Sequence, residues 1–140
     1  MAVEHTFEDA RGRATLKSAG AGVMLFEAAG YYSFELSTQA SDAMTEVAKT
    51  SSDLHIFVDF SQMDAYASKA RAHATAWCRD HFKAVSSVHI LTKPGLVAMG
   101  VATAAMTLSI MGMRFLAYTD PAAFLAEFER TKRSTSAGLP

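Results

Sequence analysis

Short apolar runs and stretches of helical spacing alternate along most of the chain. Residues 54–60 (LHIFVDF) and 88–92 (VHILT) are nearly continuous apolar segments, which is typical of strands buried on both faces of a parallel sheet. Residues 114–118 (RFLAY) predict a last strand, and apolar residues recur at helical spacing between the runs. The pattern predicts an α/β domain in which helices flank a mostly parallel sheet.

The beginning of the chain has a different pattern. Strands are expected at residues 5–8 and 13–18, separated by the turn-forming segment 9–12, and a further strand at 23–28 follows a glycine-containing reversal. This arrangement predicts an antiparallel entry hairpin. We therefore expect a mixed, mostly parallel sheet of about five strands, with an N-terminal antiparallel hairpin and about four flanking helices.

Capping signals and apolar spacing place the four helices. The first is expected to follow Ser33 as its N-cap, the second to run from about Asp64–Tyr66 to Lys83, the third to span Gly95 to Met111, and the last to begin after Asp120. The residues expected to face the core are Leu36, Ala40, Ala43, Met44 and Val47, then Ala70, Ala74, Trp77 and Cys78 or His81, and finally Phe124, Leu125 and Phe128. Residues 1–133 are predicted to form one domain, with residues 134–140 as a flexible tail.

The segment from Gly95 to Met113 contains no charged residue and is just long enough to cross a bilayer. Its glycines and many alanines, and its place between two strand-like runs, favour a buried helix over a membrane span. Its four methionines suit irregular packing. Three roles remain open for this helix: packing in the core, forming a homodimer interface, and lining a pocket for an apolar ligand.

Composition and charge limit the possible partners and compartments. Half of the residues are hydrophobic and 19% are charged, as expected for a chain that forms a core. A formal net charge of -1 with scattered basic residues predicts no nucleic-acid partner. The single cysteine, Cys78, allows no internal disulfide, and the charged first residues do not suit a signal peptide, so a cytoplasmic protein is expected.

Three segments, 54–66 (LHIFVDFSQMDAY), 88–102 (VHILTKPGLVAMGVA) and 115–129 (FLAYTDPAAFLAEFE), give the chain a family resemblance. It resembles the STAS family, the sulfate-transporter and anti-sigma-factor-antagonist domains, especially the divergent bacterial branch related to lipid-carrier-like domains. The resemblance implies a non-enzymatic domain that binds a protein partner or a small ligand, often through the turn after the second parallel strand. In the antagonists this turn carries a phosphorylatable serine within Asp-Ser-Ser-Gly. Here residues 64–69 read Asp-Ala-Tyr-Ala-Ser-Lys, and Ser68 lies closest to that position.

Candidate binding residues follow the expected strands. Ligands of open parallel sheets bind at the carboxyl ends of the strands, where helix N-termini converge. The residues predicted to bind a partner or ligand there are Tyr32, Ser61, Asp64, Tyr66, Ser68 and Lys93. Helix capping is an alternative role for the polar residues Ser33, Asp64, Thr92 and Asp120.

No catalytic residue, metal site or cofactor is predicted. His73 and His81 lie two turns apart on one expected helix, roughly 12 Å along its axis, so they cannot share one ion. Cys78 falls near the core stripe, where a thiol is inert. His55 and His89 lie within strands and are expected to be partly buried structural residues.

Two functions are compatible with these observations. The first is a STAS-like interaction or regulatory module that binds a protein partner through the Ser61 to Ser68 turn. The alternative is a carrier or sensor of a small apolar ligand, bound beside the Gly95 to Met113 helix.

Overall fold

The computed structural model describes residues 4–19, 22–51, 53–93, 95 and 112–137. Within these ranges six strands form a single sheet, and three helices flank it. The strands are β1 (Glu4–Glu8), β2 (Gly12–Ser18), β3 (Val23–Tyr32), β4 (Leu54–Tyr66), β5 (Val85–Leu91) and β6 (Arg114–Tyr118), and the helices are α1 (Phe34–Ala48), α2 (Ser68–Asp80) and α4 (Pro121–Ala137).

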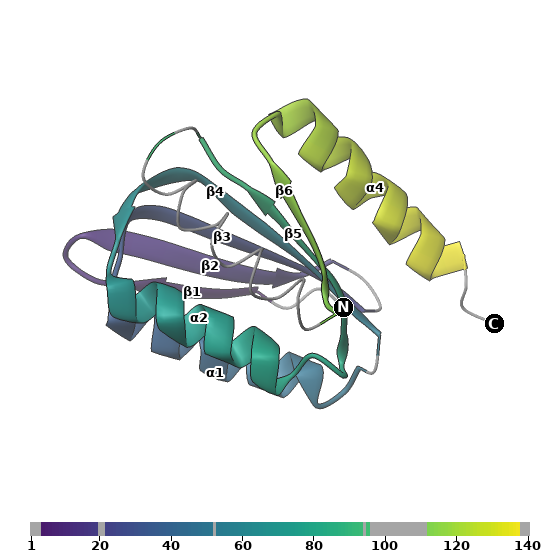
Figure 1. Cartoon of the computed structure of the whole chain (residues 1–140), viewed down its shortest axis with the longest axis horizontal. Helices are drawn as coiled ribbons and strands as arrows, with labels where there is room; N and C mark the ends of the chain where they lie inside the picture. The colour runs from purple at the N-terminus through teal and green to yellow at the C-terminus, as the bar shows by residue number, and fades with distance from the viewer. Residues whose placement is uncertain (1–3, 20–21, 52, 94, 96–111, 138–140) are drawn as a thin grey trace.

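The strands lie in the sheet in the same order as in the sequence. The β1–β2 and β2–β3 pairs are antiparallel, whereas β3 to β6 are parallel neighbours. Because parallel crossovers are right-handed, consecutive crossovers in one direction place their helices on the same face. Figure 1 shows α1 and α2 together on one face and α4 on the other. The mixed, mostly parallel α/β sheet with an entry hairpin is confirmed, with six strands rather than about five.

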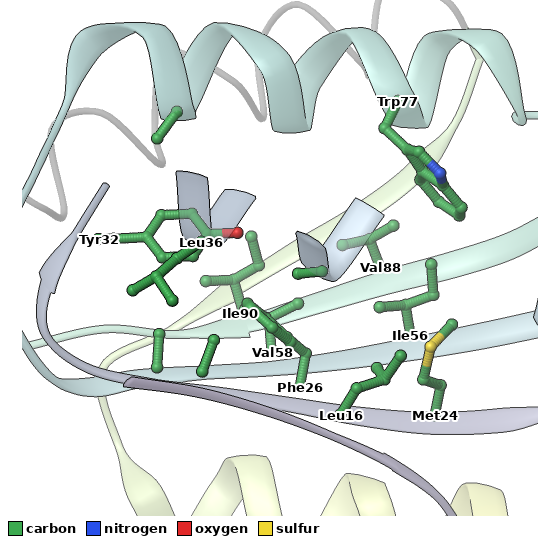
Figure 2. Close-up of a cluster of buried hydrophobic side chains, with 14 of the residues drawn as sticks. Leu16, Met24, Phe26, Tyr32, Leu36, Ile56, Val58, Trp77, Val88 and Ile90 are labelled. Carbon is green, nitrogen blue, oxygen red and sulfur yellow. The ribbon is translucent and has the colours of Figure 1, made fainter. Parts of the chain in front are cut away.

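The larger core lies between the sheet and the α1/α2 layer. Side chains alternate along each strand, so Ile56 and Val58 of β4 face this layer while Phe57 between them faces α4. Helix α1 contributes Leu36 and Ala40 from the predicted stripe. Figure 2 shows Trp77 projecting from α2 towards the sheet at one end of this cluster, with Tyr32 at the other end.

A second, smaller core lies between the sheet and α4. It consists of Val23, Phe57 and Leu91 from the strands with Phe124 and Phe128 from the helix. Leu125 was expected in this core, but it is 56% exposed. Phe124 and Phe128 are four residues apart and share one helix face, whereas Leu125 is rotated about 100° from Phe124. The helix continues to Ala137, beyond the predicted end of the domain at residue 133.

Both central strands extend further than predicted. Strand β3 ends at Tyr32 rather than residue 28, and β4 ends at Tyr66 rather than residue 60. Irregularities in the register, between Glu27 and Ala29 and between Gly30 and Tyr31, let the two strands continue pairing until Tyr32 lies opposite Tyr66. The polar residues after Phe60 belong to a strand with one exposed side, and no turn precedes α2.

The predicted helix caps have different outcomes. Ser33 caps α1, because its Oγ accepts a hydrogen bond from the Leu36 amide at 3.1 Å. Asp120 caps α4, because its Oδ1 accepts from the Ala122 amide at 3.0 Å. The proposed cap at Asp64 is wrong: this residue lies inside β4, and the N-cap of α2 is Ala67, which offers no side-chain hydrogen bond.

The predictions for the Gly95 to Met113 helix concern residues that lie almost entirely outside the described ranges. These include its proposed roles in a homodimer and beside an apolar ligand. None of the helices that the structure does describe is long and apolar enough to cross a membrane.

Candidate ligand cavity

A cavity of about 110 Å³ lies between the sheet and the α1/α2 layer. Four strands and two helices form its wall, which includes much of the apolar cluster in Figure 2. The apolar lining residues are Phe26, Tyr32, Met44, Ile56, Val58, Phe60, Met63, Tyr66, Ala74, Trp77, Cys78, Val88, Ile90 and Phe115. Most of them alternate inward along strands, so the same pattern that forms the core also forms the wall of the cavity.

Apart from Arg71, the polar side chains described around this cavity include several that already have hydrogen-bond partners. Ser41 Oγ lies 3.2 Å from His73 Nδ1, and Trp77 Nε1 donates to Thr45 Oγ1 at 2.9 Å. Among the residues described, no buried side-chain nitrogen or oxygen lacks a partner. The Trp77 ring also stacks on His81, with 4.3 Å between ring centroids. The wall is therefore mostly apolar and held in place, and Arg71 is its one charged side chain among the residues described.

Two of the six predicted binding residues, Tyr32 and Tyr66, come together at the cavity. They are register partners in neighbouring strands, and both line its wall. Tyr32 is only 6% exposed. Its burial raises the pKa of the phenol to about 12, an effect that a hydrogen bond with Ser37 partly opposes. Tyr32 therefore stays neutral, and its ring packs against Phe26 and Phe60.

The other four predicted residues do not line the cavity. Ser61 lies within β4, where both its amide and its hydroxyl donate to Asp59 Oδ1, at 2.9 and 2.6 Å. Asp64 Oδ1 lies 3.5 Å from Lys93 Nζ in an exposed ion pair. Ser68 is exposed at the first residue of α2. The segment from Ser61 to Ser68, which was predicted to be a turn, is therefore the end of β4 and the start of α2. Its Asp64 forms one exposed ion pair, with Lys93, and its Tyr66 lines the cavity.

Sequence reasoning did not identify most of the cavity wall. Phe26, Met63 and Phe115 match the pattern of ordinary core residues, because a void arises from how side chains fit together. Arg71 was also missed, although it lines the cavity from the first turn of α2. A basic residue within an apolar helix stripe was the one signal in the sequence that pointed to it.

A second buried feature lies on the opposite face of the sheet, under α4. Ser87 Oγ lies 2.8 Å from His55 Nδ1 and 2.9 Å from His89 Nε2, and His89 Nδ1 lies 2.9 Å from the Tyr118 hydroxyl. The His89 ring stacks on Phe57 with 4.2 Å between centroids. Burial lowers the pKa of His89 to about 4, an effect that Glu127 partly opposes. This histidine is therefore neutral in the folded protein and joins β5 to β6.

Ser87, His55 and the carboxylate of Asp53, just before β4, lie in the same region, but their arrangement does not suit nucleophilic catalysis. His55 Nε2 lies 3.9 Å from Asp53 Oδ1, which is beyond a hydrogen bond. Ser87 is only 1% exposed, so a substrate cannot reach its hydroxyl. On the other face, burial raises the pKa of Cys78 to about 12, which keeps it as an unreactive thiol. No group of three metal-ligating side chains occurs within the described ranges.

Neither a protein-family model nor a curated protein matches this sequence. A solved structure does: an uncharacterized protein of the DUF3478 family with a SpoIIAA-like fold, from Shewanella loihica PV-4. The two chains share 13% sequence identity with a TM-score of 0.60, over 91% of this chain and 93% of that one. The resemblance seen in the sequence is therefore confirmed for the fold: the chain has a STAS-like α/β fold of the SpoIIAA type.

Proposed function

We propose that this chain is a non-enzymatic binding domain that holds a small apolar ligand in the cavity between the sheet and α1/α2. The observation that carries the proposal is the apolar cavity of about 110 Å³. Protein interiors contain few voids larger than a water molecule. The cavity is partly open to solvent, so an apolar occupant would remove its apolar wall from water and stabilise the folded protein.

The cavity volume limits the size of the ligand. Engineered apolar cavities of about 150 Å³ stay dry and bind benzene, so this cavity suits one six-membered ring or a short branched chain. Aromatic side chains on the wall, including Phe26, Phe60 and Trp77, favour a flat ring. The ligand is then a small signal or carried molecule rather than a long acyl chain.

Toluene provides a direct test of cavity binding. A ligand that binds only the folded state raises the melting temperature, so toluene should stabilise the wild-type protein. Ala74 lines the cavity, whereas Ala72 is exposed on the same helix. The variant Ala74→Leu should fill the space and abolish the stabilisation by toluene, while Ala72→Leu should retain it. Equal shifts in all three proteins, or no shift in the wild type, would contradict the proposal.

A second candidate function is the binding of a protein partner, as in a STAS-like regulatory module. The specific observation in its favour is the exposed ion pair of Asp64 and Lys93 near the carboxyl end of β4, together with the SpoIIAA-like fold. Affinity capture should recover a partner with the wild type and lose it with Asp64→Ala combined with Lys93→Ala. Binding of the purified partner that survives in this double variant would reject the site.

A further inference from the structure

Arg71 is the basic residue on the wall of the cavity. It lies in the first turn of α2, its side chain is half-buried, and it lines the same space as Trp77 and Cys78 of that helix. A long basic side chain covers apolar surface with its methylene groups and keeps its charged end towards water. The guanidinium of Arg71 is thus expected at the edge of the cavity, within reach of a ligand that occupies it.

No Asp or Glu side chain forms an ion pair with this guanidinium. All fourteen Asp and Glu side chains of the sequence fall within the described ranges, and none forms an ion pair with Arg71. Other arginines do have such partners: Arg79 Nε lies 3.4 Å from Asp80 Oδ1, and Arg130 pairs with Glu127. A positive charge beside an apolar cavity therefore has no counter-charge among the Asp and Glu side chains.

The start of α2 adds to this positive field. Helix N-termini carry a partial positive charge and favour acidic residues, yet the first turn of α2 contains Lys69 and Arg71 and no acidic residue. Its N-cap residue, Ala67, also provides no side-chain acceptor. An anion at the cavity edge would compensate for this positive end of the helix.

We infer that the ligand of the cavity is a small amphipathic carboxylate, with a ring-sized apolar body inside the cavity and its carboxylate bound by Arg71. The inference rests on the proposed function, because it assumes that the cavity is occupied. A planar guanidinium matches a carboxylate through two parallel hydrogen bonds, which a lysine cannot reproduce. The apolar wall would then select the body of the ligand, and Arg71 would select its charge.

Benzoate and toluene separate the two parts of this inference, because they share a ring and differ in charge. Their dissociation constants should be measured by titration calorimetry for the wild type, Arg71→Gln, Arg71→Lys and the control Arg79→Gln. We expect Arg71→Gln to weaken benzoate binding about tenfold and to leave toluene binding unchanged. Arg71→Lys should recover part of the benzoate affinity, and Arg79→Gln should behave as the wild type.

The possible outcomes distinguish the inference from the proposed function. If toluene binds and Arg71→Gln does not change the benzoate affinity, the role of Arg71 is rejected while the cavity proposal stands. If neither probe binds the wild type, both are rejected. Unchanged toluene binding by Arg71→Gln also shows that this variant is folded with its cavity intact, so a loss of benzoate binding cannot come from unfolding.

Discussion

The side chains of Asp9 and Ser33 meet at 2.7 Å between Oδ2 and Oγ, although 24 residues separate them. Ser33 donates to Asp9 and at the same time accepts from the Leu36 amide, so one hydroxyl connects the β1–β2 turn to the start of α1. The other oxygen of Asp9 accepts from the amides of Arg11 and Gly12 within the turn. These hydrogen bonds lower the pKa of Asp9, with the Ser33 hydroxyl as the largest cause.

Removal of the Ser33 hydroxyl should destabilise the domain. Loss of an N-cap side chain costs about 1 kcal/mol, so Ser33→Ala should lower the free energy of unfolding by about this amount in urea titrations. Thr38→Ala is a matched control, because Thr38 lies on the same helix and its hydroxyl donates only to the Glu35 carbonyl. In a double-mutant cycle, Asp9→Ala combined with Ser33→Ala should cost less than the sum of the single changes. Strict additivity would show that the two side chains do not interact.

Gly30 should not tolerate a side chain. Its φ is +76°, and a Cβ at this position would lie 2.5 Å from the Arg11 carbonyl oxygen. We expect Gly30→Ala to destabilise the protein by more than about 1 kcal/mol, because strain and a backbone clash add together. Gly112 has a φ of +87°, and no atom of the described residues lies within 4 Å of a Cβ built there, so Gly112→Ala serves as a control with strain alone. Equal losses in denaturant unfolding would rule out the clash with Arg11.

Stability should fall with pH below about 6.5 because of His89. Its pKa is lowered from 6.5 to about 4 in the folded protein, so between these values the unfolded chain binds the additional proton. The contribution of neutral His89 to the free energy of unfolding is complete above pH 6.5. It is lost as the pH falls towards 4, by roughly 3 kcal/mol at most. The charged or titratable groups around His89 are Tyr118, whose hydroxyl lies 2.9 Å from Nδ1, and Glu127, Arg114, His55 and Arg130.

The variant His89→Gln tests this assignment, because glutamine retains hydrogen-bonding groups but does not titrate in this range. The free energy of unfolding of this variant should change little between pH 7 and pH 5, whereas that of the wild type should fall. His5→Gln, at an exposed position in β1, should keep the wild-type profile. Asp9 and Glu127 have lowered pKa values and lose their contributions only at more acidic pH. An unchanged pH profile in His89→Gln would assign the transition to other groups.

Cys78 should react slowly with alkylating reagents in the folded protein. Burial raises its pKa from 9.0 to about 12, which lowers the thiolate fraction at pH 8 roughly a thousandfold. Modification by iodoacetamide, followed by mass spectrometry, should therefore be slow in buffer and fast in concentrated urea. Rapid modification of the native protein would show that the α2 side of the cavity opens to solvent.

The sequence predicted the elements of the fold better than their ends. The apolar stripe of α1 from Leu36 and the caps at Ser33 and Asp120 follow from local chemistry, and they were correct. The ends of β3 and β4 were not predictable, because they depend on register shifts between two strands that are distant in sequence. Ser61 and Asp64 have the composition of a turn, yet pairing with β3 holds this segment in a strand.

The candidate site was predictable only in part. Tyr32 and Tyr66 were identified from their expected place at the carboxyl ends of strands, and the structure places both at the cavity. The void itself could not be inferred, because residues such as Phe26 and Val88 show the same pattern in a filled core. Arg71 gained its significance only when the structure showed that it lines the cavity and forms no ion pair with an Asp or Glu side chain.

The sequential strand order also affects how the chain can assemble as it emerges from the ribosome. Each strand pairs with the one synthesised before it, so every new strand adds to an edge that already exists. The antiparallel pairs close short loops, whereas each parallel pair must wait for its crossover segment, and domains fold from their N-termini during synthesis. Helix α4 is the last element, and it packs on β3, β5 and β6. The apolar surface around Phe57 would therefore stay exposed until synthesis is nearly complete, which makes it the face where a nascent-chain chaperone would be needed longest.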